Sequence, residues 1–232
     1  MEHMLFVQEE SSMLKNALFY CCGLNNLRPF RMRFYITGGG EVYAINRPFK
    51  CGGECCCPLE MNVFRRYSKV ADEEGSRYVP AEDILIGRVY QDFEDYGKSC
   101  GYCCLTCTNF HNIQRAIVDE KTGQTKFETA FTLTANACCC GPRNNCCGAT
   151  PFRNDAVFVI HDTKGNEVGF VQKTFAGKGD WLGACLRCCC FYDNYILEFP
   201  EGATSADDRM LILTSIFQLD YQLFEQQGGN GD

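Results

Sequence analysis

The sequence lacks several features by which common classes of protein are recognised. It has only three histidines, His3, His111 and His161, and none stands near a nucleophile in a pattern that suggests catalysis. No run of like charges is long enough for a binding tail, and no Pro-rich or Gly/Ser-rich stretch divides the chain. We therefore expect no enzyme, and we expect one domain over residues 1–225 with a flexible tail over residues 226–232.

A basic surface is also missing. The net charge is −7 and the isoelectric point is about 5.1. An acidic chain is repelled by the phosphates of nucleic acids and by anionic lipid headgroups. Nucleic acid is therefore excluded as an expected partner.

The N-terminal segment lacks the long apolar stretch of a secretory signal, and Met1 to Glu10 carries three glutamates. Cysteine, in contrast, is abundant, with 19 residues in a chain of 232. Without a signal peptide the thiols are expected to meet a reducing compartment and to stay mostly reduced. A secreted disulfide scaffold is accordingly disfavoured.

Most of the chain has the pattern of short β-strands. In Arg31 to Thr37 apolar and polar residues alternate, three glycines follow, and Glu41 to Asn46 returns, which indicates a β-hairpin. Lys121-Thr122-Gly123 and Lys164-Gly165-Asn166 indicate two further hairpin turns. The other predicted strands are Met61 to Tyr67, Ile84 to Tyr90, Phe110 to Asp119, Lys126 to Thr134, Ala156 to His161, Glu167 to Thr174 and Tyr195 to Phe199.

The C-terminal part predicts a helix instead. Ser205 followed by Asp208 resembles a capping box, and no Pro or Gly interrupts the chain from there to about Gln227. Apolar residues cover most of the helix circumference, which suggests a helix enclosed by a β-barrel. A membrane span is the less favoured alternative, because Gln218, Asp220 and Gln222 interrupt the apolar stretch.

The sequence also contains a divergent internal repeat. Cys21-Cys22-Gly23 and Arg28-Pro29-Phe30 precede one hairpin, and Cys55-Cys56-Cys57 follows it. In the second copy Cys146-Cys147-Gly148 and Thr150-Pro151-Phe152 precede a hairpin that Cys188-Cys189-Cys190 follows. Two such halves are typical of a barrel built by duplicating a set of strands.

Several of these segments resemble the phospholipid scramblase family. The segment Arg47-Pro48-Phe49-Lys50-Cys51, followed by Cys55-Cys56-Cys57-Pro58, resembles a family segment in which an Arg-Pro turn precedes Cys-Cys-Cys-Pro. Asp193 to Pro200 and the helix ending at Phe224-Glu225 are also similar to that family, so the resemblance covers most of the chain. It implies a tubby-like fold, all-β, in which a closed antiparallel barrel of about twelve strands encloses the C-terminal helix.

The resemblance further implies a membrane-associated protein involved in phospholipid movement between leaflets, with calcium as a cofactor. It implies S-acylation (palmitoylation) at Cys51, Cys55, Cys56 and Cys57, which needs thiols on a loop near a membrane. The alternative for these cysteines is a metal site or buried thiols. The implied location is the cytoplasmic face of a membrane, with membrane phospholipids as partners.

Two metal sites are open at this point. Asp193, Asn194 and Glu198 offer oxygen ligands for calcium, although calcium usually takes six to eight. The loop has Phe191 where the family has an aspartate, so we expect little response to calcium and weak scrambling. The alternative metal is zinc, because Cys100, Cys103, Cys104 and Cys107 form two C-x-x-C pairs.

The alternative function is a non-catalytic accessory subunit, in which a scramblase-like barrel joins a larger assembly of protein partners, mitochondrial or in another organelle. The acidic charge, the incomplete acidic loop and the polar end of the final helix favour this alternative.

Overall fold

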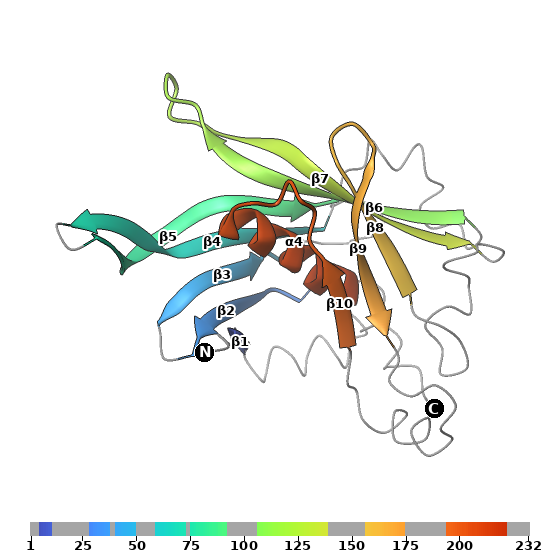
Figure 1. Cartoon of the computed structure of the whole chain (residues 1–232), viewed down its shortest axis with the longest axis horizontal. Coiled ribbons are helices and arrows are strands. Elements are labelled where there is room, and N and C mark those ends of the chain that lie inside the picture. Colours follow the sequence, from blue (N-terminus) through green and yellow to red (C-terminus); the bar gives the residue numbers. More distant parts are fainter. Residues whose placement is uncertain are drawn as a thin grey trace, which may run out of the picture. The chain divides into compact units, whose positions relative to one another are not determined.

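The computed structural model describes residues 5–10, 28–37, 40–49, 59–72, 75–91, 106–138, 156–174 and 194–221, and its described part is antiparallel β-sheet with one helix (Figure 1). The predicted all-β class is confirmed. The chain forms two compact units. The first contains Met1–Gln91, Ile113–Thr129 and Ser205–Asp232, and the second contains Asp92–Asn112 and Ala130–Thr204. The predicted single domain stays a prediction.

Ten strands are hydrogen-bonded to one another in the order of the sequence. All nine predicted strands are present, and β8 and β9 have the predicted bounds. One strand, β1, was not predicted. The strands are β1 (Leu5–Glu10), β2 (Phe30–Ile36), β3 (Glu41–Arg47), β4 (Glu60–Asp72), β5 (Gly75–Tyr90), β6 (Thr106–Val118), β7 (Thr125–Cys138), β8 (Ala156–His161), β9 (Glu167–Thr174) and β10 (Asn194–Glu198).

The expected closed barrel of about twelve strands is corrected by this sheet. It has ten strands among the described residues, and its order begins at β1 and ends at β10 without a pair between them. Closure requires hydrogen bonds between the first and last strands. The alternation of apolar residues could not show this, because it reports which face of a strand is buried and not which strand lies beside it.

In the first unit, β1 to β5 form an antiparallel meander with one strongly apolar face. Phe34 pairs with Tyr43, and Ile45 pairs with Val63. These side chains are buried, and Phe34, Ile45 and Val63 are fully so. We call the face that carries them the inner face. Because successive side chains of a strand alternate, Arg31, Arg33 and their neighbours occupy the opposite, outer face.

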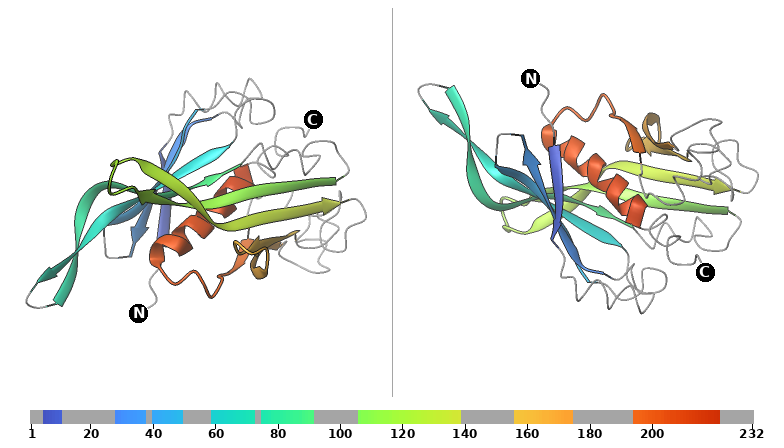
Figure 2. Two further views of the ribbon diagram at one scale, coloured as in Figure 1. Left: turned by 90° about the horizontal axis from the view of Figure 1, so that it is seen from above. Right: turned by 90° about the horizontal axis from the view of Figure 1, so that it is seen from below.

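Helix α4 (Ala206–Leu219) lies across the inner face of this meander (Figure 1, Figure 2). Ser205 caps it, since its Oγ accepts the Asp208 N–H at 3.0 Å, as the capping pattern predicted. Side chains around most of the helix are buried, but the predicted enclosure of the helix by a closed barrel is wrong, because the sheet is open. The buried residues are Asp208, Met210, Leu211, Ile212, Thr214, Ser215, Ile216, Gln218 and Leu219.

Gly87 on β5 lets α4 approach the sheet. A Cβ at this position would lie 2.1 Å from the Gln114 backbone oxygen and 2.9 Å from a methyl group of Leu211. A glycine is therefore required where β5 passes between β6 and the helix. No helix in the described part of the chain is long and apolar enough to cross a membrane.

In the second unit, β7 to β10 form a second antiparallel meander. Ile160 pairs with Leu133 and Val171 with Leu197, and Ile160, Leu133 and Val171 are fully buried. Gly165 in the turn between β8 and β9 has a φ of +83°, which an L side chain rarely adopts. The predicted hairpin at this turn is confirmed.

One hairpin of each meander, β2–β3 and β8–β9, has the same strand register. Phe30 pairs with Arg47 and Ala156 pairs with Lys173, so both partners differ by 126 positions between the hairpins. Each hairpin has its register shift just before the turn, after Phe34 in one and after Ile160 in the other. The hairpin part of the predicted repeat is thereby confirmed, whereas its cysteines lie outside the described residues.

Candidate functional site

The predicted acylation residues Cys51, Cys55, Cys56 and Cys57 lie outside the described residues. In the sequence they stand between the end of β3 and the start of β4. The remaining cysteines of Met1–Gln91, Cys21 and Cys22, stand between β1 and β2. Because neighbouring strands of the meander are antiparallel, these two connections leave the sheet at the same end. The connections at the other end contain no cysteine.

The second meander has the same distribution. All nine cysteines from Cys138 to Cys190 stand at the end of β7, between β7 and β8, or between β9 and β10. The β8–β9 turn at the opposite end has none. Phe49, at the end of β3 in the first unit, is 53% exposed although it is a large apolar residue. In each meander, then, one end is rich in thiols and the other end lacks them.

The zinc prediction is not tested. Cys100, Cys103 and Cys104 lie outside the described residues, and Cys107 is on β6. Within the ranges that the structure describes, no group of three or more His, Cys, Asp or Glu side chains could hold a metal ion.

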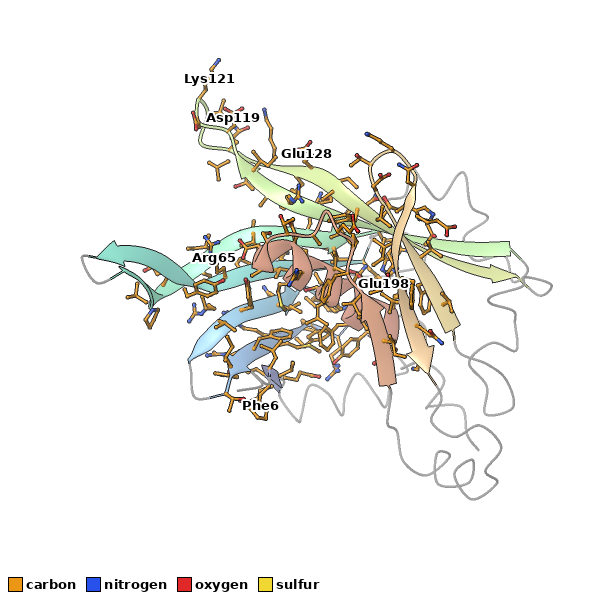
Figure 3. All side chains as sticks on the ribbon, viewed as in Figure 1. Phe6, Arg65, Asp119, Lys121, Glu128 and Glu198 are labelled. Carbon is orange, nitrogen blue, oxygen red and sulfur yellow. The ribbon has the colours of Figure 1, made fainter. Side chains whose placement is uncertain are left out.

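Some of the predicted calcium residues also lie outside the described residues. Asp193 lies outside the described residues, whereas Asn194 begins β10 and Glu198, which is exposed, ends it (Figure 3). Four residues of extended strand separate the two by about 13 Å. The calcium prediction is not tested, because Asp193 and the side chain of Asn194 lie outside what the structure describes.

The N-terminal end of α4 is held by a polar cluster in the first unit. Arg65 Nη1 donates to Asp207 Oδ2 at 2.7 Å, and the Tyr43 hydroxyl donates to Asp207 Oδ1 at 2.9 Å (Figure 3). Arg115 Nε donates to Asp208 at 2.6 Å. Burial, the hydrogen bond with Tyr67 and the charge of Asp207 raise the pKa of Tyr43 well above its ordinary value. Tyr43 therefore stays a neutral donor, and the cluster is structural.

The other end of the helix is fixed by aromatic and cationic groups. The ring of Tyr221 stacks on Phe30 with the centroids 4.4 Å apart. The guanidinium groups of Arg28 and Arg47 both lie 5.5–5.6 Å from these rings, and both arginines are buried. Glu9 accepts from Arg28 at 2.7 Å and from the Tyr221 hydroxyl at 2.7 Å. This cluster joins β1, β2 and β3 to α4, and the polarity of its residues alone did not predict that it is buried.

The outer face of the first meander is covered by ion pairs. Arg33 contacts Glu10 at 2.9 Å and Glu41 at 3.3 Å, and Arg31 contacts Asp83 at 3.0 Å. Arg66 also pairs with Glu41 and Asp83. Three arginines thus meet three carboxylates across five strands, and the described part of this face has no uncompensated basic patch.

In the second meander we call the face that carries Phe158, Ile160 and Val171 the inner face, and the opposite, outer face has a groove. Its volume is about 480 Å³, and its lining comes from β8, β9 and β10. Side chains of β8 and β9 on one face supply its apolar floor, and two carboxylates stand among its residues. The lining residues are Val157, Val159, Glu167, Val168, Gly169, Phe170, Gln172 and Glu198.

This groove was not predicted from the sequence, although the sequence of β8 carries one signal of it. Strand β2 alternates polar and apolar residues, whereas β8 reads Ala156 to Ile160 without a polar residue. A strand without alternation has apolar side chains on both faces. On the outer face of β8, Val159 is buried and Val157 is half-buried.

His111 is fully buried on β6, and His161 Nδ1 lies 3.5 Å from Thr134 Oγ1. Comparisons of this chain with protein-family models, curated proteins and solved structures find no match.

Proposed function

We propose that the protein is an acylated, membrane-peripheral β-sheet protein of the phospholipid scramblase type, which acts on lipids at the membrane surface. The observation that carries this proposal is the confinement of cysteine to one end of each meander. Acyl chains on Cys51, Cys55, Cys56 and Cys57 then attach that end of the first meander to a bilayer.

The energetics favour several acyl chains over one. Each buried CH₂ group contributes about 0.8 kcal/mol, so that a single chain binds reversibly and two or more hold firmly. Phe49, exposed beside this connection, adds apolar area at the same end. The arginines of the outer face contribute little to lipid binding, because Glu10, Glu41 and Asp83 neutralise them.

The test is fractionation of cells that express the full chain. The protein is expected in the membrane fraction, and hydroxylamine, which cleaves thioesters, is expected to release it. Replacing Cys51, Cys55, Cys56 and Cys57 by Ser is expected to give the same release without hydroxylamine. The matched control replaces Cys146 and Cys147, which stand in the second meander, and is expected to stay at the membrane. Retention of the four-serine variant would overturn the proposal.

A second function, a non-catalytic accessory subunit, is favoured by a different observation. The groove on β8, β9 and β10 gives the second unit an apolar surface of a size that suits a ligand or a side chain of a partner. Its test is the binding measurement described in the next subsection.

A further inference from the structure

The groove on the second unit has a defined chemistry. Val159 on β8 pairs with Phe170 on β9, and Phe170 pairs with Glu198 on β10, so these three residues form one row across the outer face. Val157 and Gln172 form the next row. The floor therefore combines the valines of β8 and Phe170 of β9 with the amide of Gln172, and it ends at a carboxylate on β10.

The charge of this region is negative. Glu198 is exposed at the end of β10, and Glu167 lines the groove on β9. The nearest cation of β9, Lys173, belongs to the opposite face, where it is buried with its ammonium 5.4 Å from the ring of Tyr195. A ligand with a positive group beside an apolar group complements this surface, and an anionic ligand is repelled.

The groove also lies next to a strand edge. In the order of the sheet β10 is the last strand, and within the described part of the chain no further strand pairs with it. Ile196 on the same face of β10 is 52% exposed. An extended peptide can place alternate side chains on such a face while it follows the direction of the strands.

We propose that this groove binds an extended segment of a partner protein in which an apolar side chain, seated against Phe170, stands next to a lysine or arginine that pairs with Glu198. The proposal deepens the accessory function and does not depend on acylation. It makes a surface of the second unit the recognition element, whereas the cysteines serve attachment.

The probe for the test is a fluorescein-labelled nonapeptide of alternating leucine and arginine, and its twin has glutamate in place of arginine. Fluorescence anisotropy at physiological salt is expected to show binding of the basic peptide to the full chain and none of the acidic twin. Glu198→Lys is expected to lower the affinity for the basic peptide at least tenfold and to give the acidic twin measurable affinity. Glu201→Lys, an equal charge change at an exposed residue outside the groove, is expected to change binding less than twofold.

Three results would overturn the proposal: equal binding of the basic peptide to Glu198→Lys, an equal loss in Glu201→Lys, or no binding of the basic peptide at all. Phe170→Ala tests the apolar contact. It is expected to lower the affinity for the basic peptide at least fivefold in protein whose circular dichroism is unchanged. Binding of neutral phosphatidylcholine vesicles that Phe170→Ala removes, while the peptide binds Phe170→Ala normally, would assign the groove to lipid and contradict a peptide partner. Release from membranes by hydroxylamine is a separate readout, so failure here leaves the acylation proposal intact.

Discussion

The inner faces of the two meanders are both apolar and buried, whereas their outer faces differ in chemistry. Met32, Phe34 and Ile45 of the first correspond by register to Phe158, Ile160 and Val171 of the second, and all six are buried. On the outer face, Arg31, Arg33 and Ala44 correspond to Val157, Val159 and Phe170. Packing constrains the inner residues in both copies. On the outer face, Arg31 and Arg33 are charged in the first copy, whereas Val157, Val159 and Phe170 line a groove in the other. We infer that the copies share a fold and differ in what they bind.

A buried cation shows the same relation at one position. Arg47 and Lys173 correspond by register and are 4% and 3% exposed. Arg47 lies 5.5 Å from the ring of Phe30 on the neighbouring β2, and Lys173 lies 5.4 Å from Tyr195 on the neighbouring β10. Both copies therefore have a cation beside an aromatic ring. The ring belongs to the preceding strand in the first copy and to the following strand in the second. A cation beside a ring is stabilised electrostatically by the ring face.

The largest expected effect tests the equivalence of the inner faces. Phe34→Ala is expected to lower the free energy of unfolding by about 3–5 kcal/mol and Ile160→Ala by about 2–5 kcal/mol, because each leaves a cavity at a fully buried site. Chemical denaturation followed by circular dichroism measures both. Ile36→Ala, at an exposed position next to the first site, is the control and should cost far less. A loss below about 1 kcal/mol in Ile160→Ala would mean that the inner faces are not equivalent.

A smaller effect tests a position at which the copies differ. Gly169 corresponds to Tyr43, and a Cβ there would lie 2.6 Å from the Glu198 backbone oxygen and 3.3 Å from Pro200. Gly169→Ala is therefore expected to destabilise the chain by about 1–3 kcal/mol.

Gly40→Ala is the matched control for this change, since a Cβ at Gly40 would have no atom within 4 Å and the φ of Gly40 is not positive. It is expected to change the free energy of unfolding by at most about 0.5 kcal/mol. Equal losses in the two variants would show that β9 does not approach β10 as closely as the structure has it.

The predicted and missed features of the fold have a common physical cause. The apolar run of β8 and the Lys164-Gly165-Asn166 turn gave the bounds of β8 and β9, because both report local structure. Strand β1 was missed, since Leu5, Phe6 and Val7 are three consecutive apolar residues, all exposed, without alternation. The pairing of β4 with β5 is longer than predicted, and Pro80 on β5 lies in it next to a register shift.

The candidate sites were also predicted only as far as local sequence patterns reach. The cysteine motifs were visible in the sequence. That they stand at one end of each meander followed only from the direction of the strands. The calcium residues Asn194 and Glu198 are close in sequence and are separated in space by the extension of β10. The groove depends on the pairing of three strands, which no local pattern contains.

The smallest expected effect concerns the ion pairs of the first outer face. Burial raises the pKa of Asp83, but hydrogen bonds from Arg66 and Arg31 outweigh it and hold the pKa below its ordinary value. The contribution of Asp83 to stability is therefore complete above its ordinary pKa and is lost as the pH falls through the lowered value.

Asp83→Asn is expected to cost about 0.2–1 kcal/mol near pH 7, because the pair is partly exposed, and to cost nothing at a pH below the lowered pKa. Thermal unfolding from about pH 7 to about pH 2 measures this difference. Glu201→Gln in the second unit, at an exposed carboxylate that forms no ion pair with the described residues, is the control. A pH-independent difference for Asp83→Asn would contradict the assignment to ionic contacts.

The central claim is that the outer face of the second meander carries recognition and can be separated from its fold. The most direct measurement transplants residues of the first copy into the second, in the double variant Val157→Arg and Phe170→Ala, which introduces the counterparts of Arg31 and Ala44. We predict that unfolding stays cooperative, with a free energy within about 2 kcal/mol of the parent, and that the basic peptide loses at least tenfold in affinity. A folded variant that binds the peptide as the parent does, or a variant that no longer folds, would contradict the claim.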